Sequence, residues 1–313
     1  MASSLGSGGA PVKGPAVRRA SFVHNGYRLA YDVYGSGERL LVYLHGLLLD
    51  ADLNRGIATA LAERGNTVVL LDLLGHGRSD KPQHASTYRM DLYVDQVVAL
   101  LDELGAPEAV LGGLSLGANV SLLAAAEAPT RVRGLVLEMP VLERAVPSAA
   151  MTFVPLLLGL HYGRPALRLV NGVARRLPRT PFGPLNSVIH AASLDPEQMA
   201  AVLHGVLVGP ICPTHEQRAA ITAPTLILAH RADLLHPFDD ATNLVHQMPN
   251  ALLVRARSPF ELRLRPHRLT AEIAAFLDDV WSMSSSRLMS FPLRTTSSSI
   301  GDGALDTAEI PSA

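Results

Sequence analysis

In the segment Ala109-Val-Leu-Gly-Gly-Leu-Ser-Leu-Gly-Ala-Asn119, an apolar run ends in two glycines, a serine follows, and a helical pattern begins at once. Residues Gly113 to Gly117 match G-x-S-x-G, the pattern of a nucleophile elbow. A strand that turns sharply into a helix forces the serine into a strained backbone conformation, and glycines on either side let neighbouring chain approach without clashes. The free N–H groups of the helix N-terminus favour a negatively charged oxygen. The segment therefore predicts a nucleophilic Ser115.

Strands and helices alternate on both sides of this elbow. Asn25-Gly26 is typical of a two-residue hairpin turn, with strands at 21–24 and 27–34. Apolar runs at the following positions predict buried strands: 39–44, 67–72, 109–111, 133–138, 224–230 and 251–256. Helical patterns cover 52–64, 90–104, 116–127, 238–247 and 268–281. This alternation predicts an α/β fold with a mostly parallel, doubly wound sheet.

The strand pattern stops between residues 139 and 223, where the sequence is apolar, punctuated by proline and helical in pattern. We therefore predict a core of residues 20–138 and 224–282 that is interrupted by a helical cap, residues 139–223. The apolar segments of the cap, 153–160 and 202–208, either line a hydrophobic pocket or pack on the core. Residues 1–19 and 283–313 are rich in small and polar residues, which predicts a disordered leader and a disordered tail.

The composition limits the kinds of partner and compartment. In 313 residues, 27 Lys and Arg oppose 28 Asp and Glu without a basic block, so nucleic acid is not an expected partner. The single cysteine, Cys212, excludes an internal disulfide and fits a reducing compartment. The N-terminus lacks the apolar core of a secretion signal, and the longest apolar stretch, 149–162, is too short to span a bilayer. We expect a cytoplasmic protein without a transmembrane segment; its oligomeric state stays open.

Four segments carry a family likeness. His45-Gly46 follows a buried strand, and Asp72-Leu-Leu-Gly-His-Gly-Arg-Ser79, the elbow and His230-Arg-Ala-Asp233 come after it in order. Together they resemble the α/β-hydrolase fold, in its capped group of esterases, lipases and peroxidase-like proteins. The likeness covers roughly residues 21–281. It implies an α/β-hydrolase core with an inserted helical cap, although a fold does not determine a function.

The resemblance also implies roles for individual residues. Ser115 matches the nucleophile, and Asp233 matches the acid that orients the catalytic base. The backbone N–H groups of Leu47 and Leu116 match the oxyanion-hole donors. The glycine-rich loop after Asp72 resembles a structural turn of the fold. No metal or organic cofactor is implied.

The histidine departs from the family pattern. The family base lies on the loop after the last strand, about seven residues before a proline that opens the final helix. When Pro266 is aligned with that proline, Pro259 occupies the histidine position, and the nearest histidine is His267. Serine needs an imidazole to accept its proton near pH 7. We take His267 as the candidate base; His236, His190, His204 or His215, or no base at all, are the alternatives.

These observations predict a serine hydrolase, carboxylesterase-like, that cleaves an ester-type acyl bond of a small hydrophobic substrate through an acyl-enzyme on Ser115. Two alternatives remain open. A protein without a working base would bind a hydrophobic ligand without turnover, and the same pocket could serve lyase-type or peroxidase-like chemistry. Glu138, at the end of its strand, is either an alternative acid or a buried polar partner, and we favour the second interpretation.

Overall fold

The computed structural model describes residues 17–231, 233 and 235–283. These residues form one eight-stranded sheet with the spatial order β1-β2-β4-β3-β5-β6-β7-β8. The strands are β1 (Val17–His24), β2 (Tyr27–Tyr34), β3 (Arg39–Leu44), β4 (Asn66–Asp72), β5 (Ala109–Leu114), β6 (Val132–Glu138), β7 (Thr225–Ala229) and β8 (Ala251–Arg255). β2 pairs antiparallel with both of its neighbours, β1 and β4. The six strands β4, β3, β5, β6, β7 and β8 are parallel to one another, which confirms the predicted α/β fold class.

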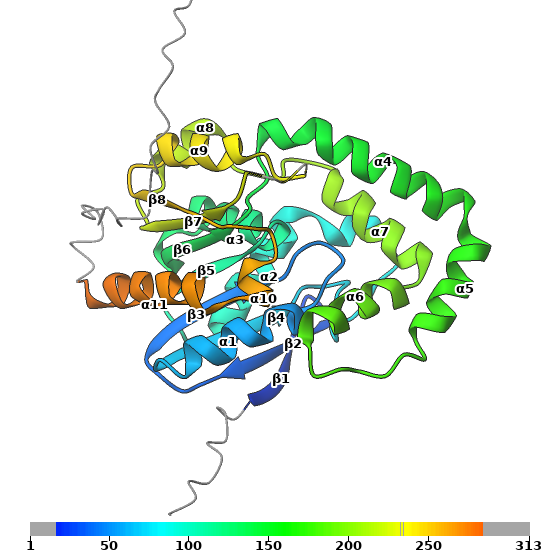
Figure 1. The fold of residues 1–313 in the computed structure, drawn as a ribbon, viewed down its shortest axis with the longest axis horizontal. Helices are drawn as coiled ribbons and strands as arrows, with labels where there is room; N and C mark the ends of the chain where they lie inside the picture. Colours follow the sequence, from blue (N-terminus) through cyan, green and yellow to red (C-terminus); the bar gives the residue numbers. More distant parts are fainter. Residues whose placement is uncertain (1–16, 232, 234, 284–313) are drawn as a thin grey trace, which may run out of the picture.

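Helices cover both faces of the sheet (Figure 1). On one face α1 (Arg55–Ala62) and α11 (His267–Ser282) pack on alternate side chains of the central strands. On the other face lie α2 (Met90–Glu103), α3 (Leu116–Glu127) and α9 (Phe238–Gln247). Because both faces are covered, the central strands are apolar at nearly every position rather than alternating, as parallel strands usually are.

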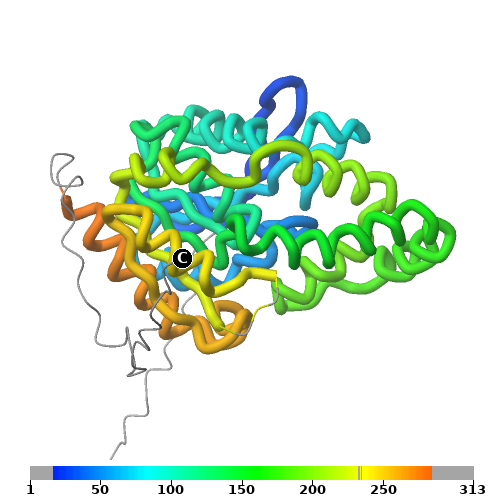
Figure 2. The backbone as a smooth tube through the Cα atoms, turned by 90° about the horizontal axis from the view of Figure 1, so that it is seen from above, coloured from blue at the N-terminus to red at the C-terminus, as the bar shows by residue number. Residues whose placement is uncertain are grey.

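The chain leaves the sheet after β6 and returns at β7. Between them lie the 3-10 turn η4 (Glu143–Ala145) and the helices α4 (Val146–Tyr162), α5 (Arg164–Ala174), α6 (Gly183–Ser193), α7 (Pro196–Leu207) and α8 (His215–Ala220). In Figure 1, α4 and α5 form the outermost arch, and α6 and α7 lie between this arch and the sheet. Figure 2 shows the same helices extending to one side of the core. We call α4 to α7 the cap.

Two sequence-based boundaries differ from the structure or fall outside it. The predicted leader, 1–19, is too long, because β1 begins at Val17 and pairs with β2 along its whole length. Its first residues, Val17-Arg-Arg, are exposed on an edge strand and carry no apolar alternation that would mark a strand. Of the predicted tail, 283–313, all but Met283 lies outside the described residues.

One helical segment among the described residues, Glu143–Tyr162, is long and apolar enough to cross a bilayer by length and composition alone. Only 17% of its most apolar window is buried. The sequence-based estimate that the stretch 149–162 is too short is wrong on length, because the helical segment begins at Glu143 and tolerates the charges of Glu143 and Arg144. This segment consists of η4 and the largely exposed helix α4.

The cap contacts the core at Asp50, just before the 3-10 turn η1 (Ala51–Asn54). The Asp50 N–H donates a hydrogen bond to Ser187 Oγ of α6, and Asp50 Oδ2 lies 4.0 Å from His190 Nδ1. Burial, together with the nearby charge of Asp72, raises the pKa of Asp50 to about 6. Burial also lowers the pKa of His190. At neutral pH the ionised Asp50 carboxylate therefore destabilises the folded state relative to the unfolded state.

Asp50→Asn is expected to stabilise the protein at pH 7.5 and to have little effect near pH 4. The folded pKa of Asp50 lies above the unfolded value, so the native state holds the extra proton and wild-type stability falls as pH rises from about 4 to about 6. The amide removes that cost, for a gain of about 1–2 kcal/mol at pH 7.5. Urea unfolding of both proteins at the two pH values measures this, and an equal difference at both would contradict it.

Candidate active site

Ser115 stands at the sharp turn between β5 and α3. Its backbone has φ 52° and ψ −106°, a conformation rarely adopted by residues other than glycine. The turn is held in place because the Ser115 N–H donates to the Glu138 carbonyl at 2.8 Å and its own carbonyl accepts from the Asn119 N–H at 2.9 Å. This is the strained elbow that the G-x-S-x-G pattern predicts.

The two elbow glycines lie where no side chain fits. A Cβ on Gly117 would stand 2.7 Å from the Leu44 Cβ and 2.8 Å from the Leu44 carbonyl oxygen. A Cβ on Gly113 would stand 2.7 Å from that same oxygen. Close packing of the elbow against the end of β3 is therefore the physical reason for both glycines.

The histidine beside Ser115 is His236. Its Nε2 lies 2.9 Å from Ser115 Oγ, and its Nδ1 lies 2.8 Å from Asp233 Oδ2. A carboxylate can only accept a hydrogen bond, so Nδ1 carries the proton and Nε2 is free to accept the serine hydroxyl. Serine, imidazole and carboxylate thus form a continuous chain of hydrogen bonds, the geometry of a catalytic triad.

Asp233 is held in its ionised form. Its Oδ1 accepts hydrogen bonds from the backbone N–H groups of Leu235, at 2.8 Å, and His236, at 3.2 Å. Partial burial raises the pKa of Asp233, but the hydrogen bond and charge of His236 and these backbone bonds outweigh burial and bring the pKa to about 2. Buried His230 also places its Nε2 3.2 Å from Asp233 Oδ2. The carboxylate is therefore charged throughout the neutral pH range.

The choice of His267 as the residue beside Ser115 is wrong. His267 is the exposed first residue of α11, whereas His236 is on the loop between β7 and α9, three residues after Asp233. Pro259, on the loop after β8, lines the cavity next to Ser115, where the family pattern expects a histidine. The histidine that contacts Ser115 is therefore on the loop after β7 rather than on the loop after β8. The spacing Asp233-x-x-His236 was the readable signal for this arrangement.

The other candidate histidines lie elsewhere. His190 is on α6 next to Asp50. His204, near the end of α7, and His215, at the start of α8, are exposed. Of the histidines considered from the sequence, His236 is the one that the structure places against Ser115.

Leu47 and Leu116 lie beside Ser115 and line the same small pocket, of about 60 Å³. Leu116 is the first residue of α3, so its N–H is among those that have no partner within the helix. Leu47 follows Gly46 in a turn closed by a hydrogen bond from the Leu49 N–H to the Gly46 carbonyl, 3.1 Å, with Leu48 at φ 63°. Both residues are thus in position to present backbone to a group bound at Ser115.

Glu138 is a buried polar partner, as favoured from the sequence. Its carboxylate accepts a hydrogen bond from the Tyr43 hydroxyl at 2.8 Å and pairs with the Arg263 guanidinium. The Arg263 Nη2 also donates to Asn54 Oδ1 at 2.8 Å. This buried network joins the end of β6 to α10 (Glu261–Leu264), the short helix that forms one wall of the cavity.

A cavity of about 540 Å³ opens next to Ser115, Asp233 and His236. Its walls are mostly apolar side chains from the loop after β3, the cap, the segment around α10, the end of β5, and the segments that follow β6 and β7. They include Leu47, Leu48, Leu49, Leu53, Leu114, Met139, Phe153, Phe182, Leu185, Val188, Leu235, Phe260 and Leu264. The volume and the apolar walls are typical of sites for small organic molecules.

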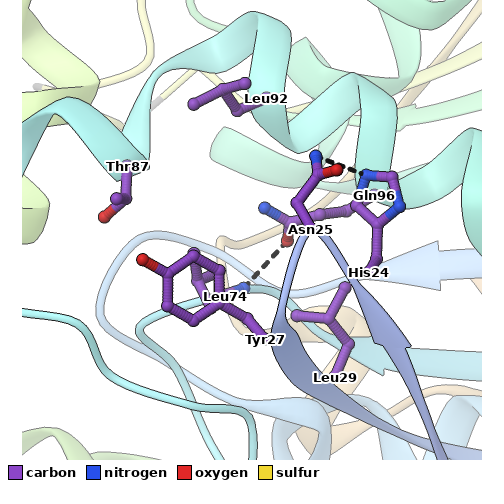
Figure 3. A pocket seen from close by; sticks show the side chains of 8 residues that line it. All are labelled: His24, Asn25, Tyr27, Leu29, Leu74, Thr87, Leu92 and Gln96. Carbon is purple, nitrogen blue, oxygen red and sulfur yellow. Dashed lines mark hydrogen bonds between the residues drawn. The ribbon is translucent and has the colours of Figure 1, made fainter.

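A separate pocket of about 60 Å³ lies under the β1–β2 hairpin (Figure 3). His24, Asn25, Tyr27 and Gln96 are among its lining residues, and none of its lining residues reaches the cavity beside Ser115. Gln96 Oε1 accepts a hydrogen bond from the Leu74 N–H at 2.9 Å, which ties α2 to the loop after β4. The Gln96 side chain therefore holds the loop after β4 in place.

Neither the lone cysteine nor a metal cluster offers a second reactive centre. Cys212 packs against the core, and burial raises the pKa of its thiol to about 11, so the thiolate is scarce at neutral pH. Among residues 17–231, 233 and 235–283, no group of three or more His, Cys, Asp or Glu side chains is arranged to hold a metal ion.

Comparison with known proteins identifies the fold that carries this site. Residues 39–160 match the family described as alpha/beta hydrolase fold. The enol-lactonase from Burkholderia xenovorans LB400 superposes with a TM-score of 0.66, covering 83% of this chain and all of that chain, at 20% identity. The protein has the α/β-hydrolase fold. Within this fold Ser115 stands at the strand–helix turn and Asp233 is hydrogen-bonded to His236, the histidine that contacts Ser115, whereas the predicted His267 does not contact it.

Sequence relatives of this α/β-hydrolase-fold protein match only in part. A haloalkane dehalogenase from Mycolicibacterium paratuberculosis is 37% identical over 112 residues, which is 35% of this chain and 37% of the relative. The 2-(acetamidomethylene)succinate hydrolase of Mesorhizobium japonicum is 36% identical over 102 residues, 33% of this chain and 35% of the relative. The similarity spans about a third of the length of these curated relatives, so it does not transfer their activities or substrates.

Proposed function

We propose that the protein is a serine hydrolase that cleaves an ester-type acyl bond of a small hydrophobic molecule. The observation that carries the proposal is the hydrogen-bonded chain from Ser115 through His236 to Asp233. Similarity to a dehalogenase, which the partial matches include, does not by itself decide the bond cleaved. A serine hydroxyl with an imidazole base is suited to attack a carbonyl carbon.

In the proposed reaction Ser115 Oγ attacks the ester carbonyl as His236 Nε2 takes the hydroxyl proton. The resulting imidazolium is stabilised by the Asp233 carboxylate, and the backbone N–H groups of Leu47 and Leu116 stabilise the oxyanion. His236 returns the proton to the departing alcohol, which leaves an acyl group on Ser115. Water, deprotonated by His236, then attacks that acyl group, releases the acid and restores the serine.

The apolar walls of the cavity favour a hydrophobic substrate. Apolar residues surround the space beside Ser115, and the charged side chains that reach it belong to the triad or to the Arg263 pair. Each buried CH₂ group contributes about 0.8 kcal/mol, a factor of about four in affinity. Within the length that the cavity holds, longer acyl chains are therefore expected to lower KM.

Reaction with a fluorophosphonate probe and hydrolysis of p-nitrophenyl acetate, butyrate and octanoate test the proposal. Wild type is expected to label and to hydrolyse the esters with KM falling as the chain lengthens, and Ser115→Ala is expected to do neither. The alternative protein, a ligand binder without turnover, would bind the octanoate saturably but would not label. A folded wild type that neither labels nor hydrolyses any of the three esters would overturn the proposal.

A further inference from the structure

The polar side chains of the cap helix α5 contact the neighbouring cap helices, although those of Arg164 and Arg168 remain 42% and 58% exposed. Arg164 and Arg168 reach Glu197 of α7, with N–O distances of 3.5 and 3.1 Å. Buried Asn171 and, just beyond the helix, Arg175 donate to carbonyl groups at the end of α6, at 2.5 and 3.0 Å. The charged and polar groups of the helix are thus used in holding it to the cap.

The other side of α5 is apolar and points into solvent. Leu169 is 73% exposed, Val170 and Val173 are each 54% exposed, and Leu177, just after the helix, is 49% exposed. A surface helix of a water-soluble domain normally turns its apolar stripe inward. The exposed apolar stripe of α5 therefore indicates that an apolar environment covers this side of the helix.

The neighbouring helix α4 carries a second exposed apolar stripe, whose successive members are about one helical turn apart. Its members and their exposures are Met151 79%, Val154 52%, Leu158 53% and Tyr162 78%. A different side of the helix faces the catalytic cleft, since Ala149 and Phe153 line the small pocket beside Ser115. With one side committed to protein, α4 is suited to lie on an apolar layer rather than to cross it.

The charge of this region identifies the partner. From Ala145 to Leu194 the sequence contains no Asp or Glu, and its charged residues are Arg164, Arg168, Arg175, Arg176 and Arg179. Arg164 and Arg168 pair with Glu197 of α7, which leaves three arginines of this stretch to set the charge of its surface. A second copy of the chain seated on the same face would bring like charges together, which opposes symmetric self-association. A surface that combines an apolar layer with negative charge is an anionic lipid bilayer.

We propose that the outer face of the cap binds the surface of a bilayer that contains anionic lipids. We define this face by the exposed apolar residues of α4 and α5 named above, with Arg176 and Arg179 just beyond the end of α5. The apolar side chains would lie at the boundary between headgroups and acyl chains, and the arginines at the phosphate level. The two helices form the outer arch of the molecule, so this contact leaves the sheet in water (Figures 1 and 2).

Flotation of the purified full chain with lipid vesicles tests this inference without requiring any catalysis, so its outcome is separate from that of the esterase proposal. The vesicles are phosphatidylcholine alone, or phosphatidylcholine with about 30 mol% phosphatidylglycerol. Leu169→Glu/Val173→Glu alters the apolar face. Val17→Glu/Val23→Glu is the matched control, because these valines are 45% and 71% exposed on β1, an edge strand of the core.

Wild type is expected to float with the anionic vesicles, and Leu169→Glu/Val173→Glu to lower the partition coefficient by about tenfold or more while the control variant leaves it unchanged. Arg176→Gln/Arg179→Gln is expected to reduce the preference for anionic over neutral vesicles. Wild type that floats with neither vesicle, or an equal loss in the control, would overturn the proposal. So would a wild-type dimer in sedimentation velocity that Leu169→Glu/Val173→Glu converts to monomer, since a second copy would then be the partner.

Discussion

His236→Ala is expected to lower kcat/KM for p-nitrophenyl butyrate by about 10⁴-fold and to abolish fluorophosphonate labelling. His236 Nε2 is the nitrogen within hydrogen-bond distance of Ser115 Oγ, at 2.9 Å, and a serine without a base is a poor nucleophile at neutral pH. Removing one member of a triad typically costs several orders of magnitude in rate. Labelling and ester hydrolysis at pH 7.5 measure the loss.

His267→Ala is the matched control for that prediction. It replaces the histidine nearest to the usual family position, but this residue is exposed at the start of α11. The variant is therefore expected to keep wild-type labelling and kcat/KM. The reverse result, with labelling lost in His267→Ala and retained in a folded His236→Ala, would refute the assignment. Urea midpoints close to that of wild type would establish that both variants are folded.

Arg263→Met is expected to destabilise the protein by about 3–5 kcal/mol, because it leaves the Glu138 carboxylate buried without its cation. The two side chains are 6% and 5% exposed, and the carboxylate keeps only the hydrogen bond from Tyr43. Burial, with the Glu138 charge, also holds the pKa of Tyr43 well above its usual value, so the tyrosine stays a neutral hydrogen-bond donor and supplies no positive charge in place of Arg263. Urea unfolding at pH 7.5 measures the change.

Two further variants separate this effect from the loss of any arginine. Glu138→Leu/Arg263→Met removes both charges and is expected to be more stable than Arg263→Met alone, since no unpaired ion remains. Arg89→Met breaks an exposed pair, Arg89 with Asp91 at 2.6 Å, and is expected to cost less than about 1 kcal/mol. A loss below about 1 kcal/mol for Arg263→Met as well would show that the buried pair is not needed for stability.

The buried pair also bears on the active site. Arg263 lies on α10. Pro259 and Phe260 directly precede this helix, and all three residues line the cavity. In the usual family pattern this loop supplies the histidine. Here Pro259 and Phe260 of this loop form part of the apolar wall of the cavity, and Arg263 of α10 pairs with Glu138 at the end of β6. With the imidazole supplied from the β7 loop, the β8 loop is left to shape the cavity.

Local sequence patterns predicted the sheet and the elbow, and the family resemblance added Asp233 as the candidate acid. Continuous apolar runs are the local signal of strands buried on both faces. The glycines of G-x-S-x-G are needed because the elbow packs closely against Leu44. Asp233 was found through the resemblance to the α/β-hydrolase fold, in which the acid follows the penultimate strand. Each of these signals lies within a few residues of the feature that it predicts.

Two features were settled by contacts between distant segments: which histidine contacts Ser115, and which side of the cap faces out. The spacing Asp233-x-x-His236 places the imidazole near the carboxylate, but Ser115 and His236 are 121 residues apart, and their contact depends on the path of the loop after β7. In the same way, the sequence of α5 predicts an apolar side and a polar side, but their orientation depends on Glu197 and the end of α6. Contacts between distant segments are set by packing, and the periodicity of one helix does not contain them.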